Sequence, residues 1–357
     1  MSKIQFNNQK APFYKTLKEK VDHYFSTTRK DSGGNAKLYL KSILQVSTAA
    51  AMYVTLVFFT PGTLISLVLC ALLGINLALL GFNIMHEGGH QSFSKHKWLN
   101  KASGYFLNVL GGNSYFWKIK HNINHHTYTN IEGMDTDIEV KPFMRLHEDQ
   151  PRRWYHKFQH IYWIILYGLS YFMWIFYNDF QKYFTGKIAP GNGEGKKMDF
   201  KEHVIFWATK LLYVGVYIII PILMIGVMKT IIGFAVICFA CGLSISIVFQ
   251  LAHIVEGTSF PKVNEETQKI EQEWAIHQIN TTADFATKNK LVSWLLGGLN
   301  FQVEHHLFPK VSHVHYPAIR KMVKETCDEF KVKYLEFPST LHAIYSHLVH
   351  IKRLGKV

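Results

Sequence analysis

The chain has 357 residues, of which 48% are hydrophobic and 15% aromatic, and the apolar residues gather into long runs instead of spreading evenly. This distribution argues against an ordinary soluble domain and predicts a membrane protein. The formal net charge of +14 suits a face turned toward anionic lipid headgroups, and because no nucleic-acid-binding module or glycine-rich phosphate loop accompanies it, nucleic acid is not an expected partner.

A basic segment, residues 1–41, opens the chain and contains no apolar run of the kind that a secretory signal needs. We expect this segment to lie in the cytoplasm. Five runs that approach the roughly 20 apolar residues of a spanning helix follow along the chain, at residues 42–60, 63–85, 160–178, 204–228 and 231–252.

Short polar links divide four of these runs into two pairs. Residues 60–63 separate the first two runs and residues 228–230 the last two, so each pair predicts a tight hairpin. The middle run is rich in Tyr and Trp, which favour the membrane interface, and we expect it not to span. The predicted fold is an all-α membrane protein with four transmembrane helices in two hairpins, interfacial helices and a cytoplasmic, histidine-rich cap.

Three histidine clusters flank the apolar runs, and they contain His86, His90, His121, His125, His126, His305 and His306. Spacing of four residues on a helix puts two imidazoles on one face. Adjacent histidines diverge by about 100°, which suits two neighbouring metals. The clusters hold more ligands than a zinc site uses, so they predict a two-metal cage. Imidazole binds several transition metals, and iron is the metal that lets such a cage activate dioxygen.

The first cluster also satisfies the H-E-x-x-H pattern of zinc metalloproteases, in which Glu87 would be the general base. Paired glycines inside the motif are poor helix formers, and a protease would leave the other clusters without a purpose. In the metal-cage interpretation, Glu87 instead orients a ligand imidazole. The intramembrane zinc protease stays as an alternative.

An eighth ligand is expected outside the three clusters. His253 ends the last apolar run as His86 ends the second, so both should emerge at the same depth and point toward the same gap. His277, in a polar segment, is the second contender. We assign His147, His156 and His342 to ordinary surface positions.

These motifs resemble the three histidine boxes of membrane fatty acid desaturases: His86-Glu-Gly-Gly-His90, His121-Asn-Ile-Asn-His125-His126 and Phe301-Gln-Val-Glu-His305-His306-Leu-Phe-Pro309. Gln302 stands where other desaturases have the first histidine of the third box, as in the front-end (delta-6-like or delta-5-like) subgroup. Those enzymes insert a double bond between an existing one and the carboxyl end. The resemblance covers roughly residues 40–320 and implies a desaturase domain at 42–320, followed by a cytoplasmic helical segment at 321–357.

The resemblance also implies the site and its chemistry. The seven clustered histidines, and His253 beside them, would ligate two iron ions, with dioxygen as co-substrate. Gln302 or His277 would be a further ligand or hold water, while Glu87 and Asp137 would support the ligands. A di-iron membrane hydroxylase of the alkane or sterol type remains an alternative, because the same centre can rebound oxygen instead of removing a second hydrogen.

The expected partners follow from the same resemblance. The substrate is a fatty acyl chain on CoA or a lipid, within membrane lipids. The sequence contains no His-Pro-Gly-Gly cytochrome motif, G-x-G-x-x-G fingerprint or clustered cysteines. We therefore expect a separate electron donor, a ferredoxin or a free b-type cytochrome with its reductase. The active site should face the cytoplasm, at the inner membrane of a bacterium or the endoplasmic reticulum of a eukaryote.

Overall fold

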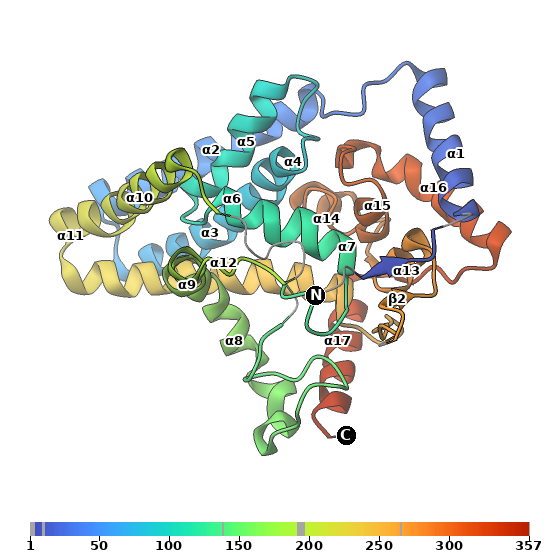
Figure 1. The fold of residues 1–357 in the computed structure, drawn as a ribbon. Coiled ribbons are helices and arrows are strands. Elements are labelled where there is room, and N and C mark those ends of the chain that lie inside the picture. Colours follow the sequence, from blue (N-terminus) through green and yellow to red (C-terminus); the bar gives the residue numbers. More distant parts are fainter. Residues whose placement is uncertain (1–3, 9–10, 138, 191–196, 265, 357) are drawn as a thin grey trace.

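The computed structural model describes residues 4–8, 11–137, 139–190, 197–264 and 266–356, and the described chain is largely helical (Figure 1). Its strands are two residues long and form two parallel pairs. β1 (Gln5–Phe6) pairs with β2 (Lys269–Ile270), and β3 (Asp284–Phe285) pairs with β4 (Glu336–Phe337). The all-α prediction is therefore confirmed, and the strands serve only to fasten the two ends of the chain to the segment after residue 253.

Five helical stretches are long and apolar enough to cross a membrane: Ala36–Phe59, Thr63–Gly89, Trp154–Thr185, Phe200–Ile225 and Val227–His253. Three of them contain the predicted runs 63–85, 160–178 and 231–252. The other two overlap the predicted runs 42–60 and 204–228 but end earlier, at Phe59 and Ile225. Leucines on their outer faces stay exposed, with Leu40, Leu64 and Leu223 at 70%, 75% and 77%. Exposed apolar faces of this size need a partner, and a bilayer covers them. The protein is an integral membrane protein.

Most of these stretches combine α-helix with a π-helical turn. In chain order they consist of α2 (Ala36–Val54) and η1 (Thr55–Phe59); α3 (Thr63–Leu80), η2 (Gly81–Met85) and α4 (His86–Gly89); η4 (Trp154–Phe158), α8 (Gln159–Met173), η5 (Trp174–Asn178) and α9 (Asp179–Thr185); α10 (Phe200–Val214), η7 (Gly215–Ile219) and α11 (Ile220–Ile225); and α12 (Val227–His253). π-helical turns are often found at functional sites, and η2 leads directly into His86.

Helix α12 packs closely against both α3 and α8. A Cβ atom on Gly74 of α3 would lie only 2.4 Å from the carbonyl oxygen of Ile237 of α12. On α12, a Cβ atom on Gly242 would lie 2.6 Å from the carbonyl oxygen of Gly168 of α8. Glycines therefore allow α12 to touch both α3 and α8 at backbone distance, as small residues do between membrane helices.

The predicted hairpins are present, but the second turn is not where the sequence suggested. The first reverses after Thr60, which has φ 41°. The second reverses at Gly226, which has φ 86°, and residues 228–230 already belong to α12. Glycine adopts this left-handed region without a steric penalty, so the chain turns at the glycine and not at the polar residues after it.

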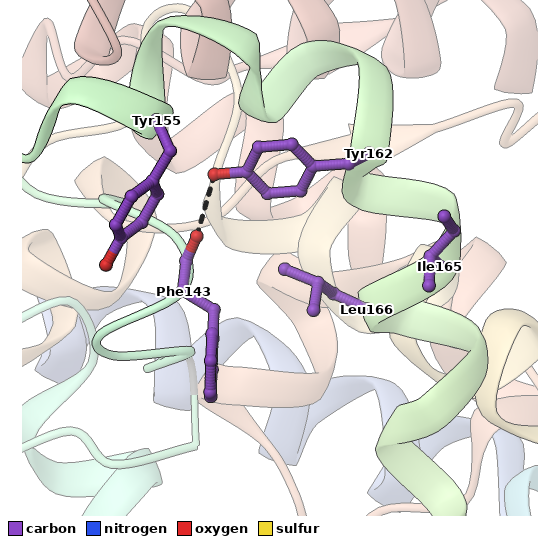
Figure 2. A pocket seen from close by; sticks show the side chains of 5 residues that line it. All are labelled: Phe143, Tyr155, Tyr162, Ile165 and Leu166. Carbon is purple, nitrogen blue, oxygen red and sulfur yellow. Dashed lines mark hydrogen bonds between the residues drawn. The ribbon is translucent and has the colours of Figure 1, made fainter.

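The middle stretch, Trp154–Thr185, runs in a different direction from the other long helices (Figure 1). Figure 1 shows α8 running across the direction of α12, instead of along it. On its outer side, Tyr155, Tyr162, Ile165 and Leu166 surround a shallow apolar pocket with Phe143, and the Tyr162 hydroxyl donates to the Phe143 carbonyl oxygen at 2.8 Å (Figure 2). An apolar, tyrosine-rich face is typical of a helix at the membrane interface.

The remaining helices cap the bundle at the end opposite the two hairpin turns (Figure 1). They are α1 (Pro12–Thr28), α5 (Lys97–Val109), α6 (Ser114–Trp117), η3 (Lys118–His125), α7 (His126–Tyr128), α13 (Trp274–Asn280), α14 (Lys290–Leu295), α15 (Gln302–Leu307), η8 (His313–His315), α16 (Tyr316–Phe330) and α17 (Thr340–Leu354). Buried apolar residues hold α1 against α13, α15 and α16. The cap thus has an apolar core separate from that of the spanning helices.

Candidate metal centre

The clustered histidines come from four separate elements that converge beneath the cap. His86 and His90 follow η2 at the end of a spanning stretch, and His121 and His125 lie in η3. The sequence predicted an α-helix around His121, but Lys118–His125 is π-helical. The wider winding still keeps these two imidazoles together, with ring centroids 5.1 Å apart.

The structure sorts seven histidines into two groups, each with nitrogen atoms within 4.8 Å of one another. The first group contains His86, His90, His121 and His305, and the second contains His125, His253 and His306. Each group draws on at least three elements of the chain. The predicted eighth residue, His253, is therefore brought into the second group.

His126 lies between the two groups. Its ring centroid is 4.7 Å from that of His90, 4.7 Å from that of His305 and 4.5 Å from that of His306. Its neighbour His125 belongs to the second group, as the divergence of adjacent side chains on a helix predicts. All eight predicted histidines thus meet in one place.

Five of these rings are oriented through their Nδ1 atoms. His121 and His125 each bond a carboxylate oxygen at 2.9 Å, from Asp137 and Asp135 respectively. His253 bonds the Thr281 carbonyl oxygen at 3.1 Å. In α15, His305 meets the Tyr316 hydroxyl at 3.2 Å, and His306 meets the Gln278 side-chain oxygen at 2.8 Å. Such contacts to the outer nitrogen fix the tautomer of a metal-ligating imidazole.

Seven of the eight histidines have a buried Nε2 atom without a hydrogen-bond partner among the described residues: His90, His121, His125, His126, His253, His305 and His306. A buried polar atom without a partner is costly. Six of these seven histidines belong to the two groups, and a metal ion in each group would satisfy such atoms through coordinate bonds. The donor set of neutral imidazoles suits iron, and also zinc, copper or nickel.

The electrostatics favour ligand imidazoles in their neutral form. Burial, and then repulsion between neighbouring imidazoles, holds the pKa of His90, His126, His305 and His306 well below its ordinary value. His125 differs: burial opposes its protonation, but the carboxylates of Asp135 and Asp137 together outweigh burial and raise the pKa of His125. Metals bind the deprotonated nitrogen of histidine. The four histidines with lowered pKa values are therefore in the neutral form that can bind a metal cation.

Glu87 does not orient a clustered imidazole, as the sequence suggested. Its Oε1 atom lies 2.6 Å from Nδ1 of His313, and Nε2 of His313 lies 3.1 Å from the Lys41 ammonium. Adjacent helical side chains point about 100° apart, so Glu87 faces away from His86 and toward the segment after α15. A protease base must reach a metal-bound water. This carboxylate is engaged elsewhere, which removes the structural basis of the H-E-x-x-H alternative.

The two residues of uncertain role occupy different places. The Gln302 amide donates to the Leu299 carbonyl oxygen at 2.8 Å, and Gln302 precedes His305 by three residues, on the same side of α15. His277 lies in neither group; its ring packs against Phe6 with centroids 5.0 Å apart. Burial lowers the pKa of His277 to about 3. The roles of both residues stay predictions.

The surface assignment of two other histidines was wrong. His147 and His156 are only 3% and 2% exposed. Each accepts a backbone N–H through Nδ1, from Asp149 and Arg153 respectively, so both stabilise local turns. His342 is exposed, as predicted.

Sequence reasoning missed three orienting residues. Asp137 was predicted to support the ligands, but Asp135, Gln278 and Tyr316 were not predicted. Gln278 lies 28 residues before its partner His306, and such a separation leaves no local pattern. The two carboxylates, two residues apart, were the available signal for Asp135.

A cavity of about 410 Å³ lies near the hairpin turns. Residues of α2, η1, α3, α11 and α12 line it, among them Leu56, Leu73, Pro221 and Ile237. None of the candidate ligands lines it.

Comparison with known proteins gives concordant matches. A family model described as "Fatty acid desaturase" matches residues 61–338. An acyl-lipid (8-3)-desaturase of Physcomitrium patens is 36% identical over 96% of this chain and 72% of its own length. The sn-1 linoleoyl-lipid 6-desaturases of Arthrospira platensis and a Synechocystis species are 34% and 33% identical, each over 99% of this chain, and over 95% and 98% of their own lengths.

Proposed function

The chain belongs to the fatty acid desaturase family, and on that premise we propose that it holds two iron ions and desaturates the acyl chain of a membrane lipid at the carboxyl side of an existing double bond. Membership makes the protein an oxidoreductase that acts on fatty acyl chains. The metal, the position of the new double bond and the acyl carrier are the proposed parts.

One observation carries the iron proposal: seven of the eight histidines fall into two groups with ligand atoms within 4.8 Å of one another, and six of these seven have a buried Nε2 without a partner among the described residues. The first ion would be held by His86, His90, His121 and His305, the second by His125, His253 and His306. His126 stands between them. When bound, the ions supply the oxidant, formed from dioxygen and electrons, that removes two hydrogens from adjacent methylenes.

The chain's own residues prepare the site for this chemistry. Asp137, Asp135 and Gln278 hold the outer nitrogens of His121, His125 and His306, so each ring presents Nε2 inward. His253 and His306 are 0% exposed. Burial keeps water from the reacting centre and so protects reactive species from side reactions.

Two features support a front-end acyl-lipid desaturase over a hydroxylase. Gln302 stands at the first position of the third motif, as in the front-end subgroup that the sequence resembles. Relatives over nearly the whole chain are named linoleoyl-lipid 6-desaturases and an (8-3)-desaturase. We therefore take an unsaturated acyl-lipid, such as a linoleoyl-lipid, as the substrate class.

We also propose that four of the five stretches cross the membrane and that the histidines face the cytoplasm. The transverse course of α8 and its tyrosine-rich face support an interfacial position for that helix. The lysines and arginines of the cap support the cytoplasmic side. A separate ferredoxin or b-type cytochrome would deliver the electrons there.

The decisive experiment is the fatty acid profile of a host that makes no polyunsaturated front-end products, expressing this chain and fed linoleate. We expect a new triunsaturated product whose extra double bond lies nearer the carboxyl end, found first in the lipid fraction. The His125→Ala variant should give no product, and His342→Ala should behave as the wild type. A hydroxylated product, or a double bond on the methyl side, would contradict the proposal.

A further inference from the structure

The indole of Trp117 lies directly against the first group of histidines. It stacks on His121, with ring centroids 4.6 Å apart and planes 23° apart. It meets His86 and His90 edge-on, with centroids 5.8 Å and 5.4 Å away. One rigid side chain therefore touches three of the four imidazoles of this group.

Gly89 makes room for that indole. A Cβ atom on Gly89 would lie 2.3 Å from Cζ3 and 2.9 Å from Cη2 of Trp117, well inside ordinary carbon–carbon contact. The Gly89 carbonyl oxygen accepts a hydrogen bond from the Asn122 amide at 2.7 Å, which ties this backbone to η3. Any side chain at position 89 would therefore push the six-membered part of the indole off the imidazoles.

The neighbouring glycine, Gly88, contacts a different part of the structure. A Cβ atom on Gly88 would lie 2.4 Å from the backbone nitrogen of Gly104 and 2.5 Å from Cβ of Ser103, so Gly88 allows α4 to touch α5. The two poor helix formers of the first motif thus have separate explanations. Gly88 serves helix packing, and Gly89 serves the metal chamber.

The second group has another aromatic neighbour. Phe249 of α12 lies with its ring centroid 5.0 Å from that of His125 and 5.3 Å from that of His253. Among the described residues, no ring contact joins Trp117 to the second group. Phe249 also reaches His121 of the first group, at a longer centroid distance of 6.1 Å. The indole thus contacts the first group alone, whereas the phenyl ring lies mainly against the second.

We propose that Trp117 is the positioning residue of the first metal position and that Gly89 lacks a side chain in order to admit it. The inference rests on the two-metal centre proposed above. Trp117 supplies no ligand atom. It restricts the rotation of three ligand rings and shields them from water, and residues around the ligands set both affinity and solvent access in this way.

The test uses the metal-free, full-length chain and cobalt(II) alone as the probe, with equilibrium dialysis to count bound ions and visible absorption to follow the two positions. The wild type should bind two ions per chain. Trp117→Leu should lower the cobalt affinity of the first position by about 10–100-fold, the usual effect of changing residues around metal ligands. The cobalt affinity of the second position should stay unchanged. Phe249→Leu should weaken cobalt binding at the second position more than at the first, because its closer ring contacts are to His125 and His253.

A double-mutant cycle separates positioning from general damage. Gly89→Ala should weaken the first position as Trp117→Leu does. The double variant should bind cobalt at the first position as tightly as Trp117→Leu alone. The indole that the methyl group of Gly89→Ala would displace is already absent in that background. Gly88→Ala is the matched control, and it should lower thermal stability without selecting one metal position.

The possible failures are distinguishable. A wild type that binds fewer than two cobalt ions contradicts the two-metal proposal itself. A wild type with two ions, together with a folded Trp117→Leu variant that retains full affinity at both positions or loses both equally, overturns the role of Trp117 alone. Additive losses in the cycle would do the same. Trp117→Phe, with its shorter ring system, replaces the leucine variant if circular dichroism shows that the latter does not fold.

Discussion

At the scale of single residues, the centre depends on the groups that hold the outer nitrogens of its histidines. Asp135 is the most connected of them: its Oδ2 atom meets His125 at 2.9 Å and accepts the Asn130 N–H at 3.0 Å, while Oδ1 accepts the Asp137 N–H at 3.1 Å. One carboxylate thus joins a candidate ligand to the loop that follows it.

We predict that Asp135→Asn weakens metal binding by about 10–100-fold, as changes next to metal ligands do. The amide has the same shape but only one acceptor oxygen, so at least one of the three donors loses its partner. Iron content per chain at limiting iron measures the effect. Asp149→Asn, at an exposed carboxylate paired with Lys262, is the control; equal iron content in both variants would refute the role of Asp135.

A second residue-scale prediction ranks the two contenders for the eighth ligand. His253→Ala should lose iron and turnover, because His253 belongs to the second group and its buried Nε2 has no partner among the described residues. His277→Ala should keep its iron, since the His277 ring packs against Phe6. Iron analysis of both purified variants decides the ranking, and the opposite pattern would reverse it.

At the scale of helices, the position of α8 decides the topology. If α8 and α9 lie along the interface, cysteines placed at Asp149 and Lys187 should be labelled by an impermeant reagent from the same side of the membrane. A cysteine at Lys229, beside the second hairpin turn, should be labelled from the other side. Labelling of Asp149 and Lys187 from opposite sides would mean that α8 spans.

The contact between α3 and α12 yields a stability prediction. Gly74→Ala places a methyl group where only 2.4 Å separates it from a carbonyl oxygen, so the helices must move apart, at a cost of about 1–3 kcal/mol for an overpacked interior. The thermal midpoint in detergent should fall. Gly62→Ala, at a glycine with no atom within 4 Å of the added carbon, should leave it unchanged, and a shift shared by both variants would show that packing is not the cause.

At the scale of the whole molecule, the metals and the fold should be separable. Lipid-facing helices satisfy their own backbone groups, and the spanning core is made of apolar contacts that include no candidate ligand. We therefore expect chelation to abolish desaturation without loss of the helical circular dichroism signal, and ferrous iron to restore activity. Unfolding on chelation would show that the metals hold the helices together.

Much of the fold could be predicted from the chain alone. The five apolar runs were found because a spanning helix needs a long local stretch of apolar residues, which any window along the sequence reveals. The second turn was misplaced by a few residues because the polar residues Lys229 and Thr230 outweighed a single glycine at position 226. The division at residues 41 and 320, and the number of spans, stay predictions.

The sequence by itself identified the histidines that meet in the candidate centre, because histidine chemistry and a spacing of one or four residues are local properties. It also placed His253 beside them, since helix length sets where a side chain emerges. Only the tertiary structure decided which histidines share a group, that Glu87 faces His313, and that Asp135, Gln278 and Trp117 surround the ligands. These pairings join residues on different elements, and no local pattern encodes contacts that form only when those elements pack.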